Sequence, residues 1–169
     1  HSPDHSLFAA AIDLNGSEIH TIDVRSLDTG LTIDKSIHNC QGDFVFSADS
    51  EFLFYTWLDE NHRPARVYRH KIGTHSDEDK LIYKEKDPGF FINVSKTASG
   101  RFIIISSHDH ADTSEVWMLS ASDPLEMPRL LWGRRHGVTC EFSDHGNTFF
   151  ILTNADNQID FRISQTAIA

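Results

Sequence analysis

One short pattern of residues recurs four times along this chain of 169 residues. In each copy a polar, tight segment precedes a run of aromatic and aliphatic residues, and the copies start 45, 50 and 46 residues apart. A period of this size is typical of repeat architectures, in which each unit buries its faces against its neighbours. The copies are SPDHSLFAAA at 2–11, SADSEFLFYT at 47–56, TASGRFIIIS at 97–106 and SDHGNTFFIL at 143–152.

The apolar residues of each unit indicate strands. A helical repeat would place apolar residues at every third or fourth position, and these units do not. They show short runs rich in β-branched and aromatic residues, separated by polar loops. About 40–50 residues per unit suits the four-stranded blade of a β-propeller. We therefore predict an all-β fold, a partial β-propeller of about four four-stranded antiparallel blades, with units starting near residues 2, 47, 97 and 143.

The same pattern places the strands within the units. The turn before each second strand carries a residue that tolerates left-handed or side-chain-bonded geometry, namely Asp4, Asp49, Gly100 and Gly146. In the second unit we expect strands at 44–46, 52–57, 65–72 and 80–84, with the next unit starting at 91. In the other units we expect third strands at 19–24, 115–119 and 159–163, and outer strands at 31–33 or 35–37 and at 129–132.

The two ends of the chain fall within blades. The chain starts at the turn before a second strand and stops just after a third strand, so it holds three blade-sized units and part of a fourth. Propellers close with ~4–8 blades. We therefore expect a piece of a longer chain, incomplete at both ends. Open strand edges seek pairing, so self-association through them is a further expectation.

Composition excludes several classes of protein. The net charge of −10 and the pI near 5.4 argue against a nucleic-acid partner. No apolar run approaches the ~18 residues of a membrane-spanning helix, and the first residues lack the pattern of a signal peptide. Cys40 and Cys140 make no metal signature, and the repeat places them at different depths, so we expect free thiols. Free thiols favour the cytoplasm.

Several stretches outside the repeat resemble the prolyl oligopeptidase family of serine peptidases. His62–Thr74, followed by 79–85 and Asp87, is similar to the propeller of that family. Three further segments resemble the branch known as oligopeptidase B or protease II. They are 112–117, 134–138, and 152–154 together with 160–163.

This resemblance implies a function. Members of the family are cytoplasmic or periplasmic peptidases in which a seven-bladed propeller caps an α/β-hydrolase domain, so the periplasm is the alternative location. The oligopeptidase B branch cleaves short peptides after Arg or Lys. The catalytic Ser, Asp and His lie in the hydrolase domain, which has no counterpart in this sequence. The resemblance therefore implies a non-catalytic propeller fragment of a serine endopeptidase. Its implied partners are the missing hydrolase domain of the same chain and the short peptide substrates.

The sequence gives little support for chemistry within the chain itself. A hydrolase of that type needs Gly-x-Ser-x-Gly, but the only glycines four apart, Gly133 and Gly137, enclose Arg135. The segment 108–112 could supply two histidine ligands to zinc, and 75–79 could attract a cation, but polar solvated loops are the favoured interpretation of both. We assign no catalytic, cofactor-binding or metal residues.

Two groups of residues remain as candidates for contacts. Arg134, Arg135 and His136 precede the innermost strand of the last unit, where they could contact the hydrolase domain by charge-assisted bonds at the propeller rim. The alternative is a surface turn whose cations balance nearby acids. The tryptophans at 57, 117 and 132 are expected to pack between blades. A protein-binding scaffold, such as a TolB-like or WD-repeat-like propeller without a peptidase link, is the alternative function.

Overall fold

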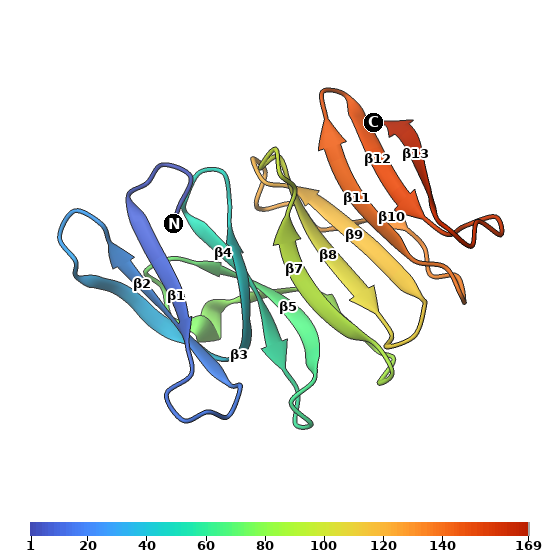
Figure 1. Ribbon diagram of the computed structural model, residues 1–169. Coiled ribbons are helices and arrows are strands. Elements are labelled where there is room, and N and C mark those ends of the chain that lie inside the picture. The colour runs from blue at the N-terminus through green and yellow to red at the C-terminus, as the bar shows by residue number, and fades with distance from the viewer. Residues whose placement is uncertain (169) are drawn as a thin grey trace.

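The computed structural model describes residues 1–168, and antiparallel sheets stand side by side in chain order (Figure 1). We call the four units blades 1 to 4. Blade 1 holds β1 (Leu7–Ile12), β2 (His20–Ser26) and the first part of β3 (Thr32–Phe46). Blade 2 holds the last part of β3, β4 (Phe52–Leu58), β5 (Pro64–Lys71) and β6 (Lys80–Lys84). Blade 3 holds β7 (Phe91–Lys96), β8 (Phe102–His108), β9 (Ser114–Ser120) and β10 (Arg129–Trp132), and blade 4 holds β11 (Cys140–His145), β12 (Thr148–Thr153) and β13 (Arg162–Ala167).

This arrangement confirms the predicted all-β fold and partial propeller. Among residues 1–168 the only helical element is one 3₁₀ turn at Ser76–Glu78, between β5 and β6. No helix in the described part of the chain is long and apolar enough to cross a membrane.

Strand β3 differs from the prediction. The outer strand of blade 1 and the innermost strand of blade 2 were expected as separate segments, but they form one strand of 15 residues. Its first part pairs with β2, up to Cys40 opposite His20, and its last part pairs with β4. The register shifts after Cys40, and Asn39 and Gly42 have positive φ angles of 58° and 114°. The irregular backbone lets the chain pass between blades without leaving the sheet, so blades 1 and 2 share a six-stranded sheet.

The apolar core lies between blades. Successive residues of a strand point to opposite faces, so Ile103 and Ile105 of β8 pack against blade 2, while Ile104 packs against blade 4. In the same way Leu53 and Tyr55 of β4 face blade 1. We call each contact between neighbouring blades a seam, and each of the three seams has its own apolar cluster. The three predicted inter-blade tryptophans pack at the edges of these clusters, at 57, 117 and 132.

The recurrent sequence pattern folds into the same turn before the second strand in three blades. The hydroxyl group of Ser47 accepts a 3.0 Å hydrogen bond from the N–H of Phe52, five residues later. Ser2 repeats this bond to Leu7 at 2.9 Å, and Thr97 repeats it to Phe102 at 3.3 Å. The turn residues behave as predicted, because Gly100 and Gly146 have positive φ angles and the carboxylates of Asp4 and Asp49 accept hydrogen bonds within their own turns.

Blade 4 departs from this plan in two ways. Its first hairpin is tighter, because His145 pairs directly with Thr148, and Ser143 therefore lies within β11 opposite Phe150. The third strand also starts later than expected, since β13 begins at Arg162 and most of the predicted segment 159–163 belongs to the preceding loop. The strand keeps its antiparallel pairing with β12.

Candidate functional site

The rim segment 134–136 lies in the connection between β10 and β11, and its three residues point to different surroundings. Arg134 turns inward: its Nη2 donates a 2.7 Å hydrogen bond to Glu85 Oε2, and its guanidinium carbon lies 3.5 Å from the centre of the Phe90 ring. Arg135 and His136 are exposed, and the Arg135 guanidinium lies 4.6 Å from the centre of the Trp132 ring. The inward position of Arg134 agrees with the alternative interpretation, in which its charge balances nearby acids.

Glu85 is the buried partner of this arginine, and its side chain is 4% exposed. It also accepts hydrogen bonds from the Ser107 hydroxyl group and, at 2.8 Å, from the N–H of Asp87. Burial alone would raise the pKa of Glu85, but these bonds and the charge of Arg134 outweigh burial and lower the pKa below its usual value. The site therefore holds a carboxylate against a guanidinium.

Residues of blade 3, together with Tyr83 of blade 2, complete this cluster. Glu115 accepts a 2.7 Å bond from the indole N–H of Trp117 and lies 3.7 Å from Nε of Arg134. The Tyr83 hydroxyl group lies 3.2 Å from a carboxylate oxygen of both Glu85 and Glu115. Glu85 directly follows blade 2, Glu115 belongs to blade 3, and Arg134 lies in the connection between blades 3 and 4. The cluster therefore joins three consecutive parts of the chain.

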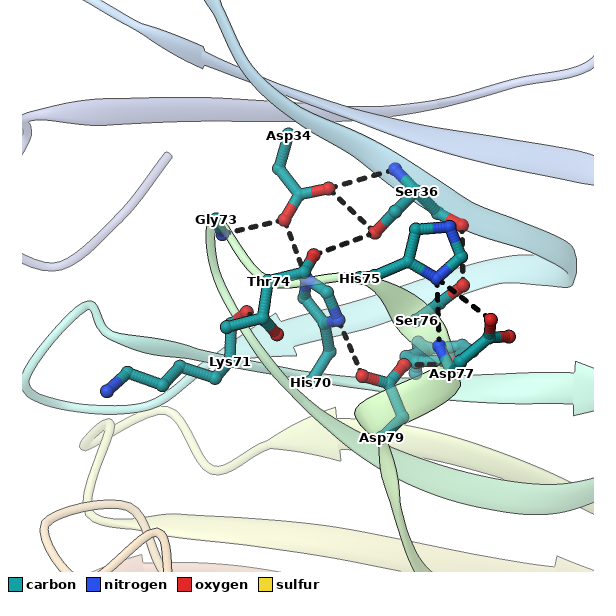
Figure 2. A network of polar contacts seen from close by, with 11 residues as sticks. Asp34, Ser36, His70, Lys71, Gly73, Thr74, His75, Ser76, Asp77 and Asp79 are labelled. Atoms are coloured by element: carbon teal, nitrogen blue, oxygen red, sulfur yellow. Dashed lines mark hydrogen bonds and ion pairs between the residues drawn. The ribbon is translucent and has the colours of Figure 1, made fainter.

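A second polar cluster, which the sequence did not predict, lies in the seam between blades 1 and 2 (Figure 2). His70 of β5 is fully buried, with Asp34 Oδ2 at 2.7 Å from Nε2 and Asp79 Oδ1 at 2.7 Å from Nδ1. The segment 75–79 was interpreted as a solvated loop. That interpretation is wrong for Asp79, whose side chain is only 2% exposed. The available signal was a histidine in register with apolar positions of a strand.

A third cluster joins blades 3 and 4. Asp144 Oδ2 accepts bonds from Nε and Nη2 of Arg101, at 2.9 and 2.6 Å, and Asp144 Oδ1 accepts a 2.8 Å bond from Ser99. The Asp144 side chain is fully buried. Each seam therefore combines an apolar cluster with a buried carboxylate that is bonded across it.

The segment with alternating histidines, 108–112, forms a hairpin loop held by its own aspartate. Asp109 Oδ1 accepts hydrogen bonds from the N–H groups of Ala111, Asp112 and Thr113, and the His110 ring lies 4.3 Å from that of Phe91. These contacts confirm the interpretation as a polar loop. Within residues 1–168, no group of three or more histidine, cysteine or acidic side chains is placed to hold a metal ion.

The two cysteines are free, as predicted, and the structure shows that both are buried. Cys40 packs in the seam between blades 1 and 2, and Cys140 packs in the seam between blades 3 and 4. Burial raises the pKa of Cys40 to about 12 and that of Cys140 to about 11. Both thiols are therefore poor nucleophiles while the seams are closed.

A cavity of about 440 Å³ between blades 3 and 4 brings serine and histidine side chains together, among them Ser114 and His108. The Ser114 hydroxyl group accepts a 2.9 Å bond from the N–H of Cys140 and lies 3.5 Å from the Cys140 sulfur. These contacts give Ser114 a structural role in joining β9 to β11. A nucleophilic serine would instead need an adjacent general base.

Comparison with known proteins shows to which family this array of blades belongs. A family model described as the N-terminal β-propeller domain of prolyl oligopeptidase matches residues 1–169. The chain belongs to the prolyl oligopeptidase family. This prolyl oligopeptidase propeller is 32% identical to Protease 2 of Moraxella lacunata over 162 residues, which are 95% of the chain but 23% of that protein.

Solved structures agree with this assignment. Oligopeptidase B from Leishmania major has a TM-score of 0.90 and 27% identity, and the match covers 98% of this chain and 23% of the other. Oligopeptidase B from Trypanosoma brucei, in a closed form with covalently bound antipain, has a TM-score of 0.87 and 29% identity over the same shares. The predicted resemblance to the oligopeptidase B branch is confirmed. The chain spans less than a quarter of the length of these peptidases, and it corresponds to part of their propeller.

Proposed function

We propose that this propeller segment serves a serine endopeptidase as a non-catalytic cover over the active site, which admits short flexible peptides and excludes folded proteins. The observation that carries the proposal is the match of the whole chain to the propeller domain of a peptidase family. The names of the relatives, Protease 2 and oligopeptidase B, favour a peptidase over a scaffold protein.

The packing of the blades supports a role as a barrier. Every seam in the described residues is filled by an apolar cluster, and a buried carboxylate bonds across each of them. Interiors packed in this way resist local deformation. The packed blades would therefore exclude a folded protein, while an extended peptide could pass through a narrow opening.

Two finer elements belong to the same proposal. Arg135 and His136 are exposed beside the connection to blade 4, and we assign them to contacts with the hydrolase domain of the full-length protein. We also assign to that protein a preference for cleavage after Arg or Lys and a location in the cytoplasm. The relationship to oligopeptidase B supports the preference, and the two free thiols support the location.

The barrier can be tested in the full-length protein by loosening one seam. Ile103→Ala removes buried volume between blades 2 and 3, whereas Ile159→Ala changes a residue that is 90% exposed. We expect the unmodified protein and both variants to cleave a fluorogenic Arg dipeptide with similar kcat/KM, and only Ile103→Ala to gain activity on a long peptide.

Two results would contradict the proposal. One is cleavage of a folded protein by the unmodified enzyme as readily as of the dipeptide. The other is an equal response of Ile103→Ala and Ile159→Ala on the long peptide. The assigned preference fails separately if substrates with Arg or Lys before the scissile bond are cleaved no faster than matched Ala substrates.

A further inference from the structure

The polar cluster between blades 1 and 2 has a hydrogen-bonding pattern that fixes the charge of its histidine. The His70 ring lies between two carboxylates, with Asp34 on its Nε2 side and Asp79 on its Nδ1 side, both at 2.7 Å (Figure 2). A carboxylate can only accept hydrogen bonds. A neutral imidazole has one N–H, so one of its nitrogens would direct a lone pair at a carboxylate oxygen. Only the imidazolium donates to both.

The two carboxylates also accept hydrogen bonds from other donors. Asp34 Oδ1 accepts bonds of 2.9 Å from both the N–H and the hydroxyl group of Ser36, and Asp34 Oδ2 also accepts a 2.7 Å bond from the N–H of Gly73. Asp79 Oδ2 accepts a 2.8 Å bond from the Tyr55 hydroxyl group. Hydrogen bonds donated to a carboxylate stabilise its charged form, so the proton between each carboxylate and the ring belongs to the ring.

The charged surroundings of His70 favour this state. The groups that face it are Asp34 from β3 and Asp79 after the 3₁₀ turn, with Tyr55 of β4 bonded to Asp79. Burial by itself lowers the pKa of His70, but the bonds and charges of the two aspartates outweigh burial and raise its pKa above the ordinary value. Farther out, the Asp23–Arg25 pair flanks Val24 on β2, opposite Asp34, and the His75–Asp77 pair is exposed on the turn.

The cluster connects two blades rather than two parts of one. Asp34 lies in the first part of β3, opposite Val24 of blade 1, whereas His70 lies in β5 of blade 2, opposite Leu53. The two blades also share β3 itself, so they are joined along the strand that passes from one to the other. The His70 bonds provide a second attachment, and the seam can open locally only if they break.

We propose that His70 is an imidazolium clamp between blades 1 and 2, and that this seam opens more readily when the ring loses its proton. The clamp is complete below the pKa of an unfolded histidine, about 6.5. Since the folded-state pKa is higher, the clamp weakens as the pH rises through that folded-state value. The seam between blades 3 and 4, which Asp144 and Arg101 join, lacks a histidine bond of this kind among the described contacts and should not follow the same pH dependence.

The two buried cysteines allow the opening of each seam to be measured in one molecule. Cys40 lies in the seam that His70 closes, and Cys140 lies in the seam between blades 3 and 4. The rate of alkylation by iodoacetamide at each cysteine, followed by peptide mass spectrometry in the full chain, reports local opening. Dividing each rate by that of the urea-unfolded chain at the same pH removes the intrinsic pH dependence of the thiol.

We expect His70→Gln to raise the corrected Cys40 rate about tenfold or more, as for the loss of a hydrogen bond to a charged group, and to leave Cys140 unchanged. His75→Gln, in the exposed pair nearby, is the matched control and should change neither rate. In the unmodified chain the corrected Cys40 rate should rise between neutral and alkaline pH while that of Cys140 stays constant.

Three outcomes would overturn the proposal. One is an unchanged Cys40 rate in His70→Gln, and another is an equal increase at both cysteines, which would mean general destabilisation. The third is a corrected Cys40 rate independent of pH in the unmodified chain. This last measurement needs no variant, so it decides the question even if His70→Gln fails to fold.

Discussion

Arg134 donates a 2.7 Å hydrogen bond to Glu85, and this bond joins the segment that leaves blade 3 to the segment that leaves blade 2. The same guanidinium lies over the ring of Phe90, just before β7. The connection between blades 2 and 3 and the connection between blades 3 and 4 are about 50 residues apart in the sequence. The bond holds these two connections together.

The bond predicts a large difference between adjacent arginines. Arg134→Met leaves the buried Glu85 carboxylate without its cation, so we expect the free energy of unfolding to fall by about 3 kcal/mol. Arg135→Met removes only an exposed contact with Trp132, and we expect a loss of less than about 1 kcal/mol. Urea unfolding at neutral pH measures both. Equal losses would show that the Glu85 contact does not stabilise the rim.

The hairpins predict a second difference, between equivalent residues of the repeat. Ser47→Ala removes the buried acceptor of the Phe52 N–H and the bond to Asp49, and should cost about 1–2 kcal/mol of unfolding free energy. Ser143→Ala changes an exposed side chain within β11, so we expect an effect within about 0.5 kcal/mol. If the two substitutions proved equivalent in thermal or urea unfolding, the hydroxyl bond could not be what stabilises the turn.

The fold could be predicted because its determinants are local and repeat. The polar turn, the strand that follows and the spacing between copies can all be read within one unit of the sequence. The merging of two strands into β3 could not be read in this way. It depends on which neighbours the backbone meets on either side of Cys40, and the two parts of the strand pair with different partners.

The polar clusters were missed for the same reason. Asp34 and His70 are 36 residues apart, and Glu85 and Arg134 are 49 residues apart. Apart from His70, which is in register with apolar positions of β5, each partner alone has the sequence appearance of an exposed polar residue. Charges that meet across a seam are recognisable only when the blades have been assembled, so the inward position of Arg134 and the burial of Asp79 required the structure.

The outer face of blade 4 predicts association of the isolated chain. Phe150 and Leu152 of β12 and Ile163 of β13 are exposed on this face, and Ile163 is 74% exposed. Exposed apolar faces of this kind favour self-association, so the sedimentation coefficient should rise with concentration. Ile163→Lys should reduce that rise, and Leu125→Lys, at an exposed loop position, should not. A concentration-independent monomer would contradict this prediction.

The bonds of Asp144 predict how stability falls in acid. Burial would raise the pKa of Asp144, but the bonds from Arg101 and Ser99 outweigh it, so its pKa lies below the ordinary value. The stabilisation is therefore complete above the pKa of an unfolded aspartate, about 3.9, and is lost as the pH falls through the lower folded-state value.

Asp144→Asn should thus be less stable than the unmodified chain at neutral pH, and its unfolding free energy should fall less steeply between about pH 5 and about pH 2. Asp28→Asn, in an exposed turn, should keep the pH dependence of the unmodified chain. Urea unfolding at a series of pH values measures all three proteins. If Asp144→Asn lost stability in acid as steeply as the unmodified chain, the carboxylate would not be the group whose protonation weakens the seam between blades 3 and 4.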